Sequence, residues 1–241
     1  MKQNVRPIDN LRQALRKQAN PAKAKLLSGF FKTGPGQYGE GDQFLGITVP
    51  AQRLVARSFA ELPLKDLGEL LKSPIHEERL TAVLILVGQF KNGDAATRQK
   101  IYTFYLKNAA RINNWDLVDA SAHHIVGAHL QDKPKDILED MTRSKVLWER
   151  RIAMVATWHE IRQGKSATAF KIAALLLKDE HDLMHKAVGW MLREVGKSAG
   201  RKELEGFLRK HYKTMPRTAL RYAIEHFPEA KRQEYLKGLV Q

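Results

Sequence analysis

Apolar residues recur along nearly the whole chain at the three- and four-residue spacing of one helix face, and strand-like alternation is almost absent. Two segments also open with helix-start residues, Asn20 before Pro21 and Ser73 before Pro74. Short connections with Gly, Pro, Asp or Lys separate the helical segments. The pattern therefore predicts an all-α protein. Further helices are expected at residues 50–62, 94–109, 112–130, 134–141, 146–163, 166–178, 181–196, 200–212, 216–226 and 228–238.

One long stretch, TGPGQYGEGDQFLGITV at residues 33–49, is rich in glycine and lacks the helical pattern. We expect it to be a long irregular loop. No stretch elsewhere has the composition of a linker between domains. The sequence thus predicts a single helical-repeat domain over residues 1–241.

Four segments resemble one another: HEERLTAVLIL, WERRIAMVATW, MHKAVGWMLRE and PRTALRYAIEH. Each places a basic residue ahead of an apolar run, and these residues are Arg79, Arg151, Lys186 and Arg217. The intervals are 72, 35 and 31 residues (79 to 151, 151 to 186, and 186 to 217). Such a period is typical of a right-handed α-solenoid of HEAT-like antiparallel helix pairs.

Equivalent positions on the inner helices of a solenoid point the same way, so the four basic residues predict a concave basic groove. Any one of them alone is explained better by a solvated helix face. Lys and Arg together number 41 against 26 for Asp and Glu, a formal net charge of +15. This excess favours a polyanionic partner, above all nucleic acid, although membrane-surface proteins have similar charge.

The chain contains no cysteine, which excludes disulfides, thiol nucleophiles and zinc–thiolate sites and suits the cytoplasm. Its N-terminal segment lacks the apolar core of a secretory signal, and its apolar runs are too short for a membrane span. We therefore expect a soluble, cytoplasmic protein.

The stretch RINNWDLVDASAHHIVG, residues 111–127, places Trp115 and Asp119 four residues apart on one helix face. Core packing beside a capping carboxylate is the ordinary explanation. Arg151 stands at the equivalent place in the next repeat, however, and Trp190 stands one repeat further. A cleft with a carboxylate, two indoles and an arginine can bind a flat cationic group.

Other site types find little support. Asp119 with His123, and His181 with His185, have the spacing of helix-borne metal ligands, but neither pair reaches the three or four ligands of a zinc site. Solvated or helix-capping histidines explain them better. The chain also lacks a phosphate-binding glycine loop and a nucleophile elbow. We expect no cofactor and no metal.

The motifs NNWDLVD, LWERRIA and KAVGWMLRE, in this order, resemble the AlkD-type DNA alkylation repair glycosylases, and FLGITVPAQRLVA and HEERLTAVLIL are similar to early segments of that family. The resemblance covers nearly the whole chain. It implies an enzyme with a HEAT-like fold that binds duplex DNA in its concave groove. This enzyme would excise cationic alkylated purines of the N3-methyladenine and N7-methylguanine types.

The resemblance also implies roles for individual residues. The catalytic carboxylate falls on Asp119, and the two active-site tryptophans fall on Trp115 and Trp190. The cleft arginine falls on Arg151, with Arg150 as the alternative register. Five further residues are expected to contact DNA: Arg150, Arg193, Lys186, Arg79 and Arg217.

No lysine stands out as a Schiff-base nucleophile, so we expect a monofunctional glycosylase that leaves an abasic site, and we expect a monomer. The long glycine-bearing stretch at residues 33–49 predicts a mobile flap near the DNA. Two alternatives remain open at this point. One is a HEAT-like protein that binds damaged or branched DNA without catalysis, and the other is a protein–protein scaffold.

Overall fold

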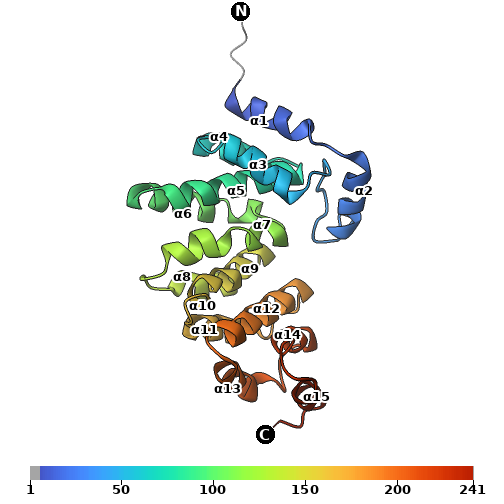
Figure 1. The fold of residues 1–241 in the computed structure, drawn as a ribbon, viewed down its shortest axis with the longest axis vertical. Coiled ribbons are helices and arrows are strands. Elements are labelled where there is room, and N and C mark those ends of the chain that lie inside the picture. The colour runs from blue at the N-terminus through green and yellow to red at the C-terminus, as the bar shows by residue number, and fades with distance from the viewer. Residues whose placement is uncertain (1–5, 241) are drawn as a thin grey trace, which may run out of the picture. The chain divides into compact units, whose positions relative to one another are not determined.

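The computed structural model describes residues 6–240, which are helical apart from turns, loops and one isolated bridge between Gln43 and Ile75 (Figure 1). The expected all-α class is confirmed. No helix in this part of the chain is both long and apolar enough to cross a membrane. By its internal contacts the chain divides into two compact units, with the division between Ser121 and Ala122. The single helical-repeat domain over residues 1–241 stays a prediction.

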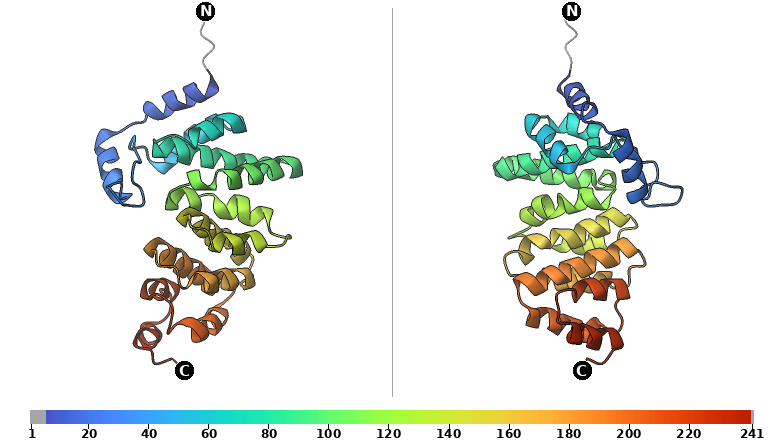
Figure 2. Two further views of the ribbon diagram at one scale, coloured as in Figure 1. Left: turned by 180° about the vertical axis from the view of Figure 1, so that it is seen from behind. Right: turned by 45° about the vertical axis from the view of Figure 1, so that its right-hand side comes forward.

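The first unit is built around α5, which packs against α3, α4, α6 and α7. Helix α2 and the loop after it contribute with α3, α5 and α7 to one cavity, and Figure 2 shows this loop standing out from the other helices. The helices of this unit are α1 (Pro7–Arg16), α2 (Pro21–Phe30), α3 (Val49–Ser58), α4 (Leu64–Leu70), α5 (His76–Asn92), α6 (Ala95–Lys107), the 3-10 turn η1 (Ala109–Arg111) and α7 (Trp115–Asp119).

The second unit is a stack of helices in two layers. In one layer α9, α12 and α14 pack in succession, and in the other α8 packs on α11 (Figure 2). Pairs α8–α9 and α11–α12 join the layers, as in a HEAT-like α-solenoid. Its helices are the π-helical turn η2 (His123–Gly127), α8 (Asp136–Thr142), α9 (Leu147–Ala156), α10 (Trp158–Ile161), α11 (Ala167–Leu176), α12 (Asp182–Ser198), α13 (Arg201–His211), α14 (Arg217–Ala223) and α15 (Glu229–Lys237).

The two expected helix starts have different outcomes. Asn20 caps α2, because its side-chain oxygen accepts the Lys23 N–H at 3.0 Å and Pro21 is the first helical residue. The start at Ser73 and Pro74 is wrong, since α5 begins at His76. The backbone of Gln43 explains the shift: its N–H donates to the Pro74 carbonyl and its carbonyl accepts the His76 N–H, which holds Ile75 extended.

The single helix expected at residues 112–130 is also wrong. Buried Asn114 starts α7 by accepting the Trp115 N–H at 2.8 Å, and α7 ends at Asp119. The Ser121 hydroxyl then donates to the Leu117 carbonyl, and the chain continues into the π-helical turn η2. At the end of this turn, a Cβ on Gly127 would lie 2.2 Å from a carbonyl oxygen of α9, so only glycine permits the close approach.

The irregular stretch at residues 33–49 is confirmed as far as Thr48, with α3 beginning at Val49. Its second half is anchored to α5. The Glu77 carboxylate accepts the N–H groups of Leu45, Gly46 and Ile47 at 3.0, 2.8 and 3.2 Å. This anchoring argues against a flap that moves as a whole.

Candidate functional site

The short helix α7 holds Trp115 at its first residue and Asp119 at its last, and both side chains are half-buried. The end of α7 is fixed from α6. The buried Tyr105 hydroxyl donates to Ser121 Oγ at 2.7 Å, while Ser121 donates in turn to the α7 backbone. Burial raises the pKa of Tyr105, and the nearby charge of Asp119 adds to the effect. Asp119 therefore lies at a helix end that hydrogen bonds from Tyr105 and Ser121 hold in place, and the nearby Tyr105 hydroxyl is neutral.

Asp116, on the same helix, binds a histidine that the sequence analysis did not single out. His76 is buried at the start of α5, with Nε2 at 2.8 Å from Asp116 and Nδ1 at 3.2 Å from Asp42. Burial by itself would lower the pKa of His76, but the hydrogen bonds to the two carboxylates outweigh it and raise the pKa to about 8. At neutral pH, His76 is thus an imidazolium that ties α7 to α5 and to the irregular loop.

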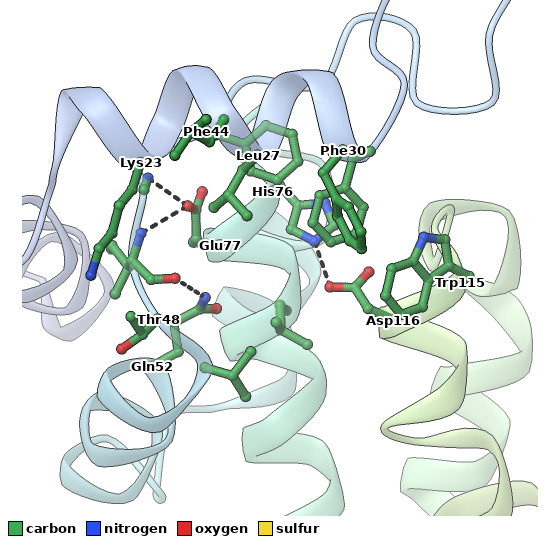
Figure 3. A pocket seen from close by; sticks show the side chains of 16 residues that line it. Lys23, Leu27, Phe30, Phe44, Thr48, Gln52, His76, Glu77, Trp115 and Asp116 are labelled. Carbon is green, nitrogen blue, oxygen red and sulfur yellow. Dashed lines mark hydrogen bonds and ion pairs between the residues drawn. The ribbon is translucent and has the colours of Figure 1, made fainter.

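Aromatic rings continue from His76 to Trp115 in a nearly parallel stack. Phe44 lies on His76 at 4.7 Å between centroids, Phe31 lies on Phe44 at 5.1 Å, and Trp115 lies on Phe31 at 5.2 Å. Phe30 meets Trp115 edge-on at 5.9 Å. The four stacked rings line one cavity, and Figure 3 shows the His76–Asp116 bond beside Trp115. The position of the Trp115 ring is therefore set by packing.

In the second unit, Trp190 lies half-buried on α12 and meets Trp158 of α10 at 5.0 Å, close to perpendicular. Trp158 in turn packs on His123, with 4.5 Å between the ring centroids. Arg151 of α9 is buried at 4% exposure, and its guanidinium donates to the Leu183 carbonyl at 2.6 Å. The second unit thus contains a cluster of three aromatic rings, and a buried arginine whose guanidinium is held by a backbone carbonyl.

The basic residue of the first repeat is one position out of register. Arg79 donates to the carbonyl of Ser73, six residues earlier, and pairs with Asp42. Arg150 does the same with the carbonyl of Ser144 and with Asp179. The counterpart of Arg79 is therefore Arg150 and not Arg151. Arg79 is 3% exposed and bound on both sides, so its expected contact with DNA phosphate has no support in its surroundings.

The remaining expected DNA contacts lie nearer the surface. Arg193 pairs with Glu194 and Glu225, and Lys186 pairs with Asp182 one turn earlier on α12 at 2.7 Å. Arg217 is exposed and donates to the Leu236 carbonyl. These three cations, together with Arg150, stay predictions as DNA-binding residues.

The histidines suspected as metal ligands have structural partners. His181 caps α12 by accepting the Leu183 N–H at 3.1 Å, and His185 bonds the Asp179 carbonyl. Over residues 6–240, no group of three or more His, Asp or Glu side chains is placed to hold a metal ion.

The sequence model of a family described as DNA alkylation repair enzyme matches residues 11–227. This chain belongs to that family. The family resemblance inferred from the motifs is thereby confirmed, and with it a role in DNA repair.

A solved structure described as a predicted DNA alkylation repair enzyme from Enterococcus faecalis shares the fold of this family member. It superimposes with a TM-score of 0.66 at 16% sequence identity, over 88% of this chain and 98% of the other. No curated protein matches the chain in a sequence comparison.

In this DNA alkylation repair enzyme, the sequence pattern points to the two ends of α7 but not to the residues around them. His76, Phe31 and Trp158 touch the named side chains directly or through one neighbour. The adjacent rings at Phe30 and Phe31, and the indole in ATWHE, were the available signals. Neither has a spacing that points to α7 or α12, so only the folded chain connects them.

Proposed function

We propose that this DNA alkylation repair enzyme is a monofunctional glycosylase that hydrolyses the N-glycosidic bond of cationic alkylated purines in duplex DNA. N3-methyladenine and N7-methylguanine are the expected lesions. The observation that supports it most is α7: a half-buried carboxylate and a half-buried indole share one braced helix in a family of alkylation repair enzymes.

The chemistry follows from the charge of the lesion. Alkylation at N3 or N7 makes the purine cationic, so it leaves with the bonding electron pair as a neutral base and needs no general acid. Positive charge then develops on the deoxyribose. The Asp119 carboxylate stabilises that charge and takes a proton from the water that adds to the sugar, which leaves an abasic site.

The other proposed residues act on charge as well. The indole faces of Trp115 and Trp190 attract the cationic sugar and base. Arg151 is proposed as the cleft arginine, with its guanidinium anchored on the Leu183 carbonyl. Asp119 and Trp115 belong to the first unit, and Trp190 and Arg151 belong to the second. Lys186, Arg193, Arg217 and Arg150 would bind the DNA backbone in a basic groove.

The test is release of free base from duplex DNA treated with a methylating agent, measured with the wild type and Asp119→Asn. Asp140→Asn is the matched control, because it removes the same charge from a carboxylate that is 69% exposed. We expect release by the wild type and the control and loss in Asp119→Asn, with DNA affinity retained. No release by the wild type, with DNA binding intact, would place the protein among non-catalytic DNA-binding solenoids.

A further inference from the structure

The first unit contains a cavity of about 440 Å³ to which the proposed reaction assigns no ligand. Its walls come from α2, the irregular loop, α3, α5 and the start of α7 (Figure 3). The volume lies within the range of small-molecule sites, which is roughly 300–1,000 Å³. We refer to it as the first-unit cavity.

Its shape suits a flat ring. Phe31 and Trp115 lie nearly parallel, at 17°, whereas Phe30 stands at 74° to Trp115, so the rings form a corner. Leu26 and Phe30 line the cavity and yet are 72% and 63% exposed. Large apolar side chains exposed around a concave, aromatic-lined surface are typical of a ligand site.

The charges around the cavity cancel. Two of the side chains that line it are positively charged, Lys23 and protonated His76. Two are negatively charged, Glu77 and Asp116. Asp116 binds His76, and Glu77 is held by three backbone N–H groups. A neutral ligand therefore matches this surface better than a cation or an anion does.

One buried polar atom of the lining residues has no hydrogen-bond partner. Gln52 is 2% exposed, and its Nε2 donates to the Ile47 carbonyl at 3.0 Å. That bond fixes the orientation of the amide, and its Oε1 is buried without a hydrogen-bond partner. A buried acceptor without a donor is costly. A ligand with an N–H group would satisfy it.

We propose that the first-unit cavity binds a neutral, flat, bicyclic heterocycle with an N–H donor, the chemical class of a free purine base. The rings of Phe30, Phe31 and Trp115 contact its faces and edges, and Gln52 Oε1 accepts its N–H. If the proposed function holds, the released alkylpurine belongs to this class, and it would bind against the wall that positions Trp115.

The experiment is calorimetric titration at about pH 7.5 with 3-methyladenine, without DNA, on the Asp119→Asn protein. Quinoline is the comparison ligand, because it is flat, bicyclic and neutral but has no N–H donor. We expect 3-methyladenine to bind one-to-one with a Kd below about 1 mM, and quinoline to bind more weakly. Gln52→Leu should weaken 3-methyladenine about 3- to 10-fold and leave quinoline unchanged.

Two further variants keep the result interpretable. Leu26→Trp fills the mouth from an exposed position without disturbing the core, and should abolish binding of both ligands. Gln99→Leu alters an exposed glutamine of α6 outside the cavity, and should change neither. Equal binding of the two ligands with no effect of Gln52→Leu, or no binding to the folded protein, would overturn the proposal. Because Asp119→Asn is used without DNA, this result is independent of whether the protein excises bases.

Discussion

Replacing His76 with glutamine should change how the stability of the protein depends on pH. The imidazole lies between Asp116 and Asp42, and its pKa in the folded state is raised from 6.5 to about 8. A raised pKa in the folded state means that the protonated ring stabilises the fold. That stabilisation is complete below the unfolded-state pKa of 6.5 and is lost as the pH rises through 8.

The size of the effect follows from the shift. A difference of about 1.5 pKa units, at about 1.4 kcal/mol for each unit, corresponds to about 2 kcal/mol. The free energy of unfolding of the wild type minus that of His76→Gln should therefore fall by about 2 kcal/mol between about pH 5.5 and about pH 9.5. Urea unfolding at the two pH values measures it, and NMR titration of the His76 ring gives the pKa itself.

The control is His129→Gln. Burial and the charge of Lys133 lower the pKa of His129, so its contribution to stability has the opposite sign and should not decrease as the pH rises. The other histidines are common to all three proteins, so their contributions cancel when the free energies of unfolding are subtracted. A wild-type-minus-His76→Gln difference that stays constant or grows with pH would refute the argument that His76 is an imidazolium clamp.

Three further predictions concern the site and the fold. In single-turnover assays, Trp115→Ala or Trp190→Ala should slow base excision by about 10-fold while weakening DNA binding less; equal losses would contradict the cation–π role. Gly127→Ala should destabilise the protein by about 2–3 kcal/mol in urea unfolding, because its Cβ would collide with a carbonyl oxygen of α9. Lys186→Ala should lower the slope of log affinity for DNA against log salt by about 1, whereas Lys171→Ala, on α11, should leave it unchanged.

The sequence predicted well those features that depend on residues close together in the chain. The helical class follows from periodicity, and the start of α2 follows from Asn20 and Pro21, whose bonds lie within one turn. The start of α5 did not follow from Ser73 and Pro74. There the deciding contact is the backbone of Gln43, some thirty residues away in the chain, and no local pattern contains it.

The same reason limits prediction of the site. Trp115 and Asp119 could be named as candidates because both lie on α7 at helical spacing. The break after α7 was missed because it depends on the side-chain bond of Ser121 and on the close approach at Gly127. His76 was missed because its two carboxylate partners come from different segments.

The alignment of the repeats by their basic residues is correct to within one position. Aligning Arg79 with Arg151 placed the right helices in correspondence but shifted the register by one residue. The bonds to Ser73 and Ser144 correct it. One residue on a helix is a turn of about 100°, which on α9 separates half-buried Arg150 from buried Arg151.

The measurement that tests the central claim most directly is the single-turnover rate of base release from one defined N7-methylguanine duplex, at saturating protein, for the wild type and Asp119→Asn. Saturation separates the chemical step from DNA binding. A catalytic carboxylate predicts a rate lower by at least about 100-fold in Asp119→Asn, with DNA affinity within about 2-fold of the wild type. Equal rates for the two proteins would contradict the account.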